Sequence, residues 1–468
     1  MAGAALQPGV TPPQPVSATA DLQWEAAESN PLRRVMFYAA LATIFLRFSM
    51  IHEFLASMLN VNLYLLYIVA PPALLGVLAT GGIRRTLSRR PAIYWLGFVA
   101  WMCFATLFSS WRGGSAAAVE FYLKSEFIML FVVAGLAMTW REVKLIAYTI
   151  AAAALVDVIM ARTFMRQEFD RIDLNSTNTI SNANDLAAHL ILLSSFVLFV
   201  ILGRKTPVFL RLIGVPVLGY SFYLIISAGS RGAIIALVLA AAAGFLWGSP
   251  KVRTVILVAV PIAALGTVAL LPDTTLLRLS TLFSSGEEFA KNSIQEEAAI
   301  SAELRKALLL KSLEMTLYHP LFGIGPEQFS IVEDQESRQT GKGRGAWLDT
   351  HNVFTKISSE CGIPALLFYL GAIVGGILLV LKAYHQARSN PGDEDIALMG
   401  FCVLVGMVGF LSAIAFLNFA YFFHQPAMTG FCIVYYGAAM HEMAARRARK
   451  APPSAALAPS PAYSSRLR

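Results

Sequence analysis

Residues 183–203 read ANDLAAHLILLSSFVLFVILG, and after Asp185 this stretch contains no Asp, Glu, Lys or Arg. A helix of about 20 mainly apolar residues crosses a hydrocarbon core about 30 Å thick. Similar runs recur along the chain, which is 56% hydrophobic and only 14% charged. Soluble domains carry about 25% charged residues, so this composition excludes a large soluble enzyme, a disordered chain and a collagen-like chain. The sequence predicts an all-α polytopic membrane protein.

The apolar runs predict about twelve transmembrane helices, with boundaries uncertain by several residues. Arg47 lies inside the first run, which makes that run the weakest of the set. The predicted spans cover residues 35–51, 60–80, 92–110, 118–138, 143–161, 183–203, 208–227, 231–248, 254–272, 352–381, 396–418 and 425–444.

Lys and Arg cluster in alternate connecting segments, for example at 84–90 and 446–450. Short cytoplasmic loops collect these residues, so we expect both termini in the cytoplasm and the long segments 162–182 and 273–350 outside, which is the periplasm in a Gram-negative bacterium. The predicted organisation is a disordered cytoplasmic N-terminus (1–30), transmembrane helices 1–9 (31–272), a large helical periplasmic loop (273–350), transmembrane helices 10–12 (351–445) and a disordered cytoplasmic tail (446–468).

Several classes of site lack support in the sequence. The cysteines have no CxxC spacing, so neither a disulfide framework nor a zinc site is expected. The outer segments contain no HExxH, Walker A or nucleotide fingerprint, so we expect no metal and no cofactor. The formal net charge of +8 is placed in alternate loops, which argues against a nucleic-acid partner. The N-terminal segment lacks an apolar core, so a cleavable signal peptide is not expected.

Arginine residues on the expected outer side run against the positive-inside pattern. Guanidinium groups bind phosphate oxygens bidentately and keep their charge, so an outer-leaflet ligand bearing phosphate would account for them. The alternative is that some of them pair with acidic neighbours such as Glu168, Asp173 and Glu303. The outer arginines are Arg162, Arg166, Arg171, Arg231, Arg278 and Arg305.

Arg231 is the strongest of these candidates for binding an anion. It lies in Ser227-Ala-Gly-Ser-Arg-Gly232, a short turn between two predicted spans. At the N-terminus of a helix, free N–H groups and the helix dipole favour an anion. Because an arginine there opposes the dipole, a bound anion explains it better than a structural ion pair does.

A second focus is Asp349-Thr350-His351-Asn352, directly before the span that begins near Val353. We expect Asp349 or Thr350 to cap this helix and His351 to lie in its first turn. A positive helix end disfavours imidazolium, so neutral His351 would be available as a general base toward a sugar hydroxyl. The alternative is a plain interfacial histidine.

Weaker polar signals lie at two other outer helix ends. Asn182, Asn184 and Asp185 open one predicted span and either bind a polar ligand or cap the helix. Tyr421 and His424 precede the last span, where interfacial anchoring is the expected role.

The long outer segment contains a helical pattern at 296–318. Apolar residues recur at Leu304, Leu308, Leu313 and Leu317 between charged residues. This spacing predicts an amphipathic helix that lies along the membrane surface or over a cavity. A turn at Gly323-Ile-Gly-Pro326 would follow it.

Together these features resemble the O-antigen ligase and O-antigen polymerase superfamily. The resemblance in topology covers nearly the whole chain, and the resemblance in motifs covers about 300–370 together with Ser230-Arg231-Gly232. The other matching motifs are Arg305, His319-Pro-Leu-Phe-Gly-Ile-Gly-Pro326 with Phe329, Thr350-His351-Asn352 and Glu360-Cys-Gly-Ile-Pro364. Many relatives carry a tryptophan just after the loop arginine, where this chain has Leu308 to Leu310.

The resemblance implies a metal-independent glycosyltransferase with a fold akin to the glycosyltransferase C class. Ligases transfer O-antigen polysaccharide from undecaprenyl pyrophosphate, the donor, to a sugar of lipid A-core, the acceptor. This reaction belongs to lipopolysaccharide biosynthesis. It takes place on the periplasmic side of the bacterial inner membrane, so membrane lipid is a further partner.

The resemblance also implies roles for particular residues. His351 matches the histidine that activates the acceptor hydroxyl, while Arg231 and Arg305 match arginines near the donor pyrophosphate. Asn184 and Asn352 are expected to make other substrate contacts. Three further arginines match only by region: Arg166, Arg171 and Arg278.

Three alternatives remain open. An O-antigen polymerase shares these motifs but takes a second lipid-linked glycan as acceptor. A protein O-oligosaccharyltransferase has a related His-Asn element but usually a longer outer C-terminal region. A transporter would place ionisable residues near the membrane midplane and broken helices in repeated halves. Asp157 is one such ionisable residue, but it lies near the outer end of its span. We prefer the ligase, with the polymerase second and the transporter a distant third.

Overall fold

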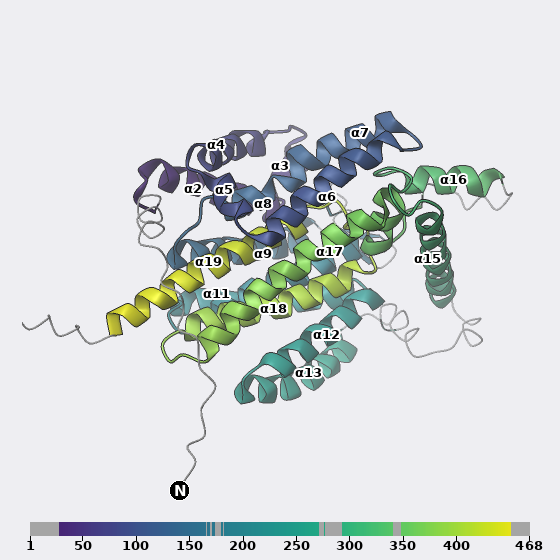
Figure 1. The fold of residues 1–468 in the computed structure, drawn as a ribbon. Helices are drawn as coiled ribbons and strands as arrows, with labels where there is room; N and C mark the ends of the chain where they lie inside the picture. The colour runs from purple at the N-terminus through teal and green to yellow at the C-terminus, as the bar shows by residue number, and fades with distance from the viewer. Residues whose placement is uncertain are drawn as a thin grey trace, which may run out of the picture.

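The computed structural model describes residues 28–164, 166–168, 171–173, 179–180, 182–270, 276, 293–339 and 348–450. The described residues are almost entirely helical (Figure 1). The α-helices are α2 (Pro31–Ser49), α3 (Ile51–Leu59), α4 (Leu65–Ala79), α5 (Gly82–Leu87), α6 (Arg90–Leu107), α7 (Arg112–Phe121), α8 (Met129–Ala134), α9 (Trp140–Phe164), α10 (Ala183–Leu202), α11 (Val208–Ser227), α12 (Arg231–Trp247), α13 (Pro250–Leu270), α15 (Ser293–Tyr318), α16 (Phe329–Gln339), α17 (Val353–Arg388), α18 (Glu394–Ile414) and α19 (His424–Lys450). A π-helix, η1 (Tyr122–Phe127), joins α7 to α8, and a short antiparallel hairpin pairs β1 (Arg166–Glu168) with β2 (Arg171–Asp173).

Each predicted span coincides with a helix of the structure or with consecutive helical segments. Among the described residues, five helices are long and apolar enough to cross a membrane: α9, α10, α11, α17 and α18. The bent pair α2 and α3 is a sixth candidate if it forms one span, and α4 and α12 are shorter apolar helices. These helices support a polytopic membrane protein, whereas the total of about twelve spans stays a prediction.

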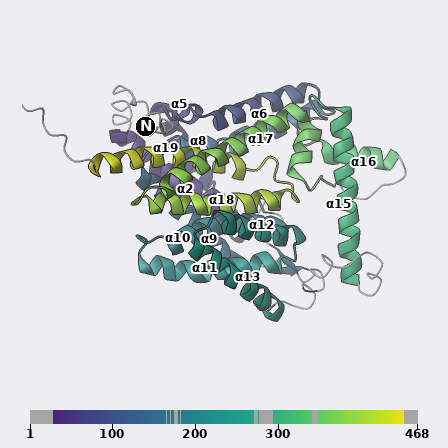
Figure 2. The same ribbon diagram turned by 60° about the horizontal axis from the view of Figure 1, so that its bottom comes forward.

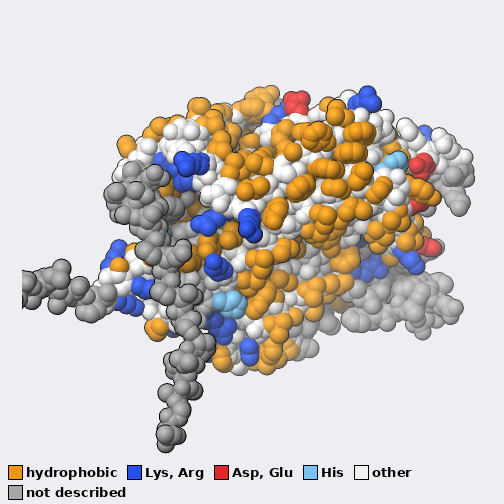
Figure 3. Space-filling view, viewed as in Figure 1, with side chains coloured by type: hydrophobic (Ala, Val, Ile, Leu, Met, Phe, Trp, Pro, Cys, Tyr) orange, Lys and Arg blue, Asp and Glu red, His pale blue; other side chains and the backbone are white. Residues whose placement is uncertain are grey.

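The surface is apolar over a wide area. Figure 3 shows hydrophobic side chains across the middle of one face, with Lys and Arg gathered mainly toward the end where α19 stops. Tyr67 and Leu75 on α4 and Leu367 and Leu378 on α17 are each more than half exposed. Contiguous apolar surface of this extent is rare on a soluble monomer, and lipid would cover it.

The centre of the bundle is α10, which is buried along nearly its whole length. It packs against α9, α11 and α18. A helix that is apolar on every side is stable only when neighbours surround it. The stretch that first identified the fold is therefore its innermost helix.

The predicted span 118–138 is not one helix. α7 ends at Phe121, η1 occupies the next six residues, and α8 begins at Met129. The buried Glu126 of η1 accepts a hydrogen bond from Arg47 at 2.6 Å. π-Helical turns are frequent at functional sites, and this one places a carboxylate against a buried guanidinium.

The first predicted span is also interrupted. α2 ends at Ser49, the next residue Met50 has a left-handed backbone (φ 47°), and the chain bends by 66° into α3. α3 was not predicted, because its residues were assigned to the loop between the first two spans. At the other end of the chain, the predicted disordered tail from 446 is wrong in its first residues, since α19 continues to Lys450.

α15 confirms the helix predicted at 296–318 and ends at Tyr318. Figures 1 and 2 show it across the end of the bundle opposite the end of α19. Its predicted apolar stripe is wrong in its second half, because Leu313 and Leu317 are exposed. The step of five residues from Leu308 to Leu313 rotates the side chain by about 140° around the helix, so Met315 is buried instead.

Candidate functional site

His351 lies in the turn that leads into α17. Asn352 caps this helix, and its side-chain oxygen accepts hydrogen bonds from two free N–H groups of the first turn, both at 3.0 Å. The predicted cap at Asp349 or Thr350 is therefore wrong, and His351 precedes the helix instead of lying in its first turn. Asparagine is a favourable N-cap because its short side chain reaches these N–H groups.

The backbone of His351 is left-handed, with φ 48°. This conformation costs about 1–3 kcal/mol in a residue other than glycine and persists only where surrounding contacts impose it. Thr350 supplies such contacts. Its N–H donates to Asp349 Oδ1 at 2.7 Å, and its hydroxyl donates to the Asn352 carbonyl oxygen at 3.1 Å. Strain of this kind clusters at active sites.

Lys356 anchors the His351 turn from within α17. Its ammonium group lies 2.5 Å from Asp349 Oδ2, 2.9 Å from Glu327 Oε2 and 3.9 Å from Glu360 Oε1. The Lys356 side chain is only 4% exposed. A buried ammonium group is tolerated where carboxylates surround it, so this cluster fixes the position of Asp349 relative to α17.

Glu360 connects the same cluster to the turn after α15. Its two carboxylate oxygens accept hydrogen bonds from Glu327 N–H at 2.9 Å and Phe329 N–H at 3.1 Å. Tyr421 also donates to Glu360 Oε2, at 2.8 Å. Glu327, like His351, has a left-handed backbone. Two strained residues therefore meet at one buried ionic cluster.

The glycines of this region allow two backbones to touch. α17 breaks at Gly362 (φ 82°), where a Cβ would lie 2.0 Å from the Leu321 carbonyl oxygen. The carbonyl groups freed by the break accept hydrogen bonds from Ile324 N–H and Gly325 N–H, each at 2.9 Å. The Gly-Ile-Gly-Pro turn and the Glu-Cys-Gly-Ile-Pro motif thus form one joint, which is held by direct contacts between their backbones.

Arg305 acts on His351 from α15. Burial is the main cause that lowers the pKa of His351, and the positive charge of Arg305 lowers it further. The nearby Asp349 carboxylate opposes these effects only in part. The imidazole is therefore neutral at pH 7 and able to accept a proton.

α15 is held by packing around Leu308. This residue is fully buried in a small cluster with Met315, Ile324 and Phe329. Leu308 thus joins α15 to the turn that follows it. This packing fixes the helix that carries Arg305.

Arg231 is the first residue of α12, as predicted. Ser230 caps the helix, and its hydroxyl oxygen accepts a hydrogen bond from Ala233 N–H at 3.4 Å. A Cβ on Gly232 would lie 3.0 Å from Phe416, in the segment that follows α18. The same segment contains Asn418, whose side-chain oxygen accepts a hydrogen bond from the Thr350 hydroxyl at 3.3 Å. The beginning of α12 and the His351 turn therefore contact one connecting segment.

The other predicted residues are placed differently. Asn184 is buried in the first turn of α10, with its N–H donating to the N-cap Asn182 at 2.9 Å. Arg166 and Arg171 lie in the hairpin, where the register pairs them with Asp173 and Glu168, the acidic neighbours of the alternative interpretation. Arg278 lies outside the described residues.

Tyr421 and His424 are not interfacial anchors. Tyr421 is buried and binds Glu360. His424 is fully buried and shares a hydrogen bond of 2.8 Å with His189, which also lies 3.2 Å from Asp157. Asp157 is therefore part of an internal polar cluster.

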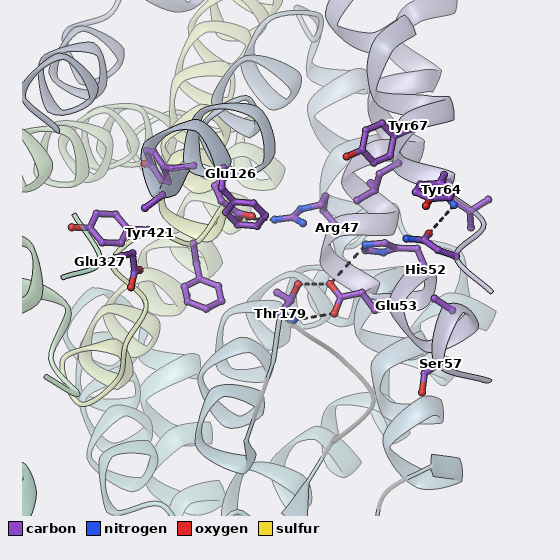
Figure 4. Close-up of a pocket in the computed structure, with 18 residues that line it drawn as sticks. Arg47, His52, Glu53, Ser57, Tyr64, Tyr67, Glu126, Thr179, Glu327 and Tyr421 are labelled. Carbon is purple, nitrogen blue, oxygen red and sulfur yellow. Dashed lines mark hydrogen bonds and ion pairs between the residues drawn. The ribbon is translucent and has the colours of Figure 1, made fainter. Parts of the chain in front are cut away.

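A cavity of about 750 Å³ lies beside the Lys356 cluster. Its walls come from the α2–α3 bend, the start of α4, α7, η1 and the segment before α19. Figure 4 shows Tyr64 and His52 on one side of it, Glu327 and Tyr421 on the other, and Arg47 between them. We call it the α3–η1 cavity.

The charged residues that build this region were not predicted as site residues from the sequence. Arg47 was expected only to weaken the first span, and Glu126 and Lys356 were given no role. All three lie within apolar segments, and ionisable residues in such segments mark functional sites more often than not. Arg47 and its partner Glu126 are 79 residues apart in the sequence. Motif spacing relates only residues that are close in sequence, so it could not predict this pair.

Residues 216–370 match the family model described as O-antigen ligase. This segment contains Arg231, Arg305, His351 and the joint between the turn and α17. A comparison with curated proteins found no match.

Proposed function

Residues 216–370 carry a domain of the O-antigen ligase family, and from this premise we propose that the protein is an O-antigen ligase. It transfers O-antigen polysaccharide from undecaprenyl pyrophosphate to a sugar hydroxyl of lipid A-core. The proposed reaction takes place on the periplasmic side of the bacterial inner membrane and needs no metal.

The observation that carries the proposal is the environment of His351. A half-buried imidazole with a lowered pKa lies in a strained turn, under the influence of Arg305. A neutral imidazole is the form that removes a proton from a hydroxyl group. A guanidinium close by is the group that binds and stabilises a pyrophosphate. This pairing supports the attack of an alcohol on a sugar linked to pyrophosphate.

In the proposed mechanism His351 accepts the proton of the acceptor hydroxyl. The hydroxyl oxygen attacks the anomeric carbon of the first O-antigen sugar, and the bond from that carbon to the pyrophosphate oxygen breaks. Undecaprenyl pyrophosphate leaves with the bonding electron pair. A single displacement inverts the anomeric configuration.

We assign Arg231 and Arg305 to the pyrophosphate, whose charge grows as the bond breaks. Preorganised positive groups that face developing charge supply several kcal/mol of transition-state stabilisation in other enzymes. The start of α12 adds free N–H groups to the Arg231 side. Arg166, Arg171 and Arg278 are proposed as further contacts to the donor, and Asn184 as a contact to substrate.

Asn352 is proposed in a dual role. Its side-chain oxygen caps α17, and its amide nitrogen is assigned to a substrate oxygen. The conservative variant Asn352→Asp separates these roles, because aspartate caps a helix equally well but has no amide donor.

The decisive experiment is a lipopolysaccharide gel from the source strain after deletion of this gene. We expect the O-antigen bands to disappear, core to remain unmodified and lipid-linked polymer to accumulate. Wild-type complementation should restore the bands, while His351→Ala and Arg231→Ala, at equal protein levels, should not. A core with a single repeat would indicate a polymerase, and an unchanged gel would refute the assignment to lipopolysaccharide.

A further inference from the structure

We infer that the α3–η1 cavity binds the uncharged sugar portion of the acceptor. The inference rests on the proposed function and extends it, because it assigns the acceptor to a place separate from the arginines of the donor site. Its volume of about 750 Å³ falls within the range of about 300–1,000 Å³ for small-molecule sites.

The charge of the lining excludes a pyrophosphate from this cavity. Three carboxylates line it, from Glu53, Glu126 and Glu327, and Arg47 is the single Lys or Arg among the lining residues. Arg47 is already engaged, because it binds Glu126 at 2.6 Å and lies 4.4 Å above the Phe423 ring. A pyrophosphate entering here would therefore meet an excess of negative charge.

The same lining suits a sugar. Tyrosine rings give flat apolar faces with a polar edge, and Tyr64 and Tyr67 form an edge-to-face pair, with ring centroids 5.8 Å apart, on one wall. Carboxylate oxygens accept hydrogen bonds from hydroxyl groups. Aromatic faces combined with a few polar groups are typical of sites that orient a small ligand.

Two buried polar atoms on the wall also point to a ligand. The Tyr122 hydroxyl and Arg47 Nε have no hydrogen-bond partner among the described residues, and both side chains line the cavity. Native proteins seldom leave such groups unsatisfied. A hydroxyl-rich ligand that fills the cavity would provide the partners.

The cavity adjoins the His351 turn. Glu327 and Tyr421 line it, and each of them also belongs to the ionic cluster under that turn, through Lys356 and Glu360 respectively. Glu327 thus connects the cavity wall through Lys356 to Asp349, two residues before His351. A sugar held against Glu327 would lie beside the cluster that positions the turn of the proposed base.

Two neighbouring alanines of α7 provide a matched test. Ala118 lines the cavity, whereas Ala117 is exposed and does not. The full-length protein, purified in detergent, is measured for transfer with lipid-linked donor and lipid A-core acceptor. We expect Ala118→Trp to raise the KM for the acceptor about tenfold or more, with the KM for the donor unchanged. Ala117→Trp should leave both constants unchanged.

A second measurement uses no donor. The probe is core oligosaccharide released from lipid A, and its binding to the same proteins is followed by calorimetry. We expect binding to wild type and Ala117→Trp, and about tenfold weaker binding to Ala118→Trp. Equal binding to all three proteins, or a rise in donor KM alone, would overturn the acceptor site.

The two proposals fail in different ways. Wild-type protein that binds core oligosaccharide through the cavity but transfers nothing would refute the ligase and retain the sugar site. Transfer that is sensitive to Arg231→Ala but indifferent to Ala118→Trp would retain the ligase and refute the site.

Discussion

Replacing Lys356 with methionine should destabilise the protein and abolish transfer. The change removes the cation that lies within 4 Å of Asp349, Glu327 and Glu360, at a side chain that is 4% exposed. Loss of one partner from a buried ionic pair costs about 3–5 kcal/mol. The half-exposed Glu327 regains water, so we do not expect a multiple of this value.

The expected loss of stability can be measured as a decrease in melting temperature. With about 2.1 cal/mol/K per residue, the 468 residues of the chain have an unfolding entropy of about 1 kcal/mol/K if they unfold together. Lys356→Met should then lower the melting temperature of the purified protein by about 3–5 °C. The assay is thermal unfolding in detergent, followed by intrinsic fluorescence.

Lys124→Met is the matched control. Lys124 also pairs with a glutamate four residues away, Glu120, at 2.9 Å, but both side chains are more than half exposed. Exposed pairs contribute little to stability, so this variant should melt with the wild type. If Lys356→Met and Lys124→Met melted at the same temperature, the assignment of Lys356 as the anchor of the His351 turn would be wrong.

Three further predictions follow from the same geometry. The transfer rate should fall on the acid side as His351 becomes protonated, and Arg305→Ala should move this fall to higher pH, because removal of the positive charge raises the pKa of His351; a rate–pH profile that does not move would contradict the electrostatic link. Gly362→Ala should destabilise the protein by at least about 2 kcal/mol, since its backbone (φ 82°, ψ 171°) lies in a region populated almost only by glycine, which costs other residues about 1–3 kcal/mol, and the added Cβ would meet the Leu321 carbonyl oxygen. Gly219→Ala, with no atom within 4 Å of its Cβ, should be neutral or stabilising in thermal unfolding. Asn352→Ala should lose about 0.5–2 kcal/mol of stability through the cap; Asn352→Asp should recover the melting temperature but not the transfer rate, and recovery of both would leave Asn352 with a capping role alone.

The helices could be predicted from the sequence because each apolar run is a local property. Residues 183–203 and α10 agree at both ends within one residue. The breaks inside the runs could not be predicted, because they depend on distant partners. η1 interrupts one run at the point where Glu126 binds Arg47. At the break of α17 near Gly362, the free carbonyl groups bind N–H groups of a turn about forty residues earlier in the chain.

The positions of candidate residues could be predicted where a single residue or a short motif indicated them. Arg231 begins a helix as expected, and the His351 turn lies directly before α17. The surrounding cluster was missed because Lys356 and Glu327 are brought together by the fold and not by spacing. Tyr421 was assigned to the interface for the same reason, since its bond to Glu360 joins residues 61 positions apart.

The distribution of charge around His351 would hold the donor and the acceptor of the proposed reaction at different groups. Arg305 lowers the pKa of His351, whereas the Asp349 carboxylate raises it. Asp349 and Glu327 both bind Lys356, and Glu327 also lines the α3–η1 cavity. A negatively charged pyrophosphate and a neutral sugar are therefore attracted to different partners. After proton transfer, the Asp349 carboxylate would offset part of what the imidazolium loses to burial and to Arg305. With the pyrophosphate at the arginines and the acceptor sugar in the cavity, the acceptor hydroxyl and the anomeric carbon would meet at His351. Neither substrate would occupy the site of the other.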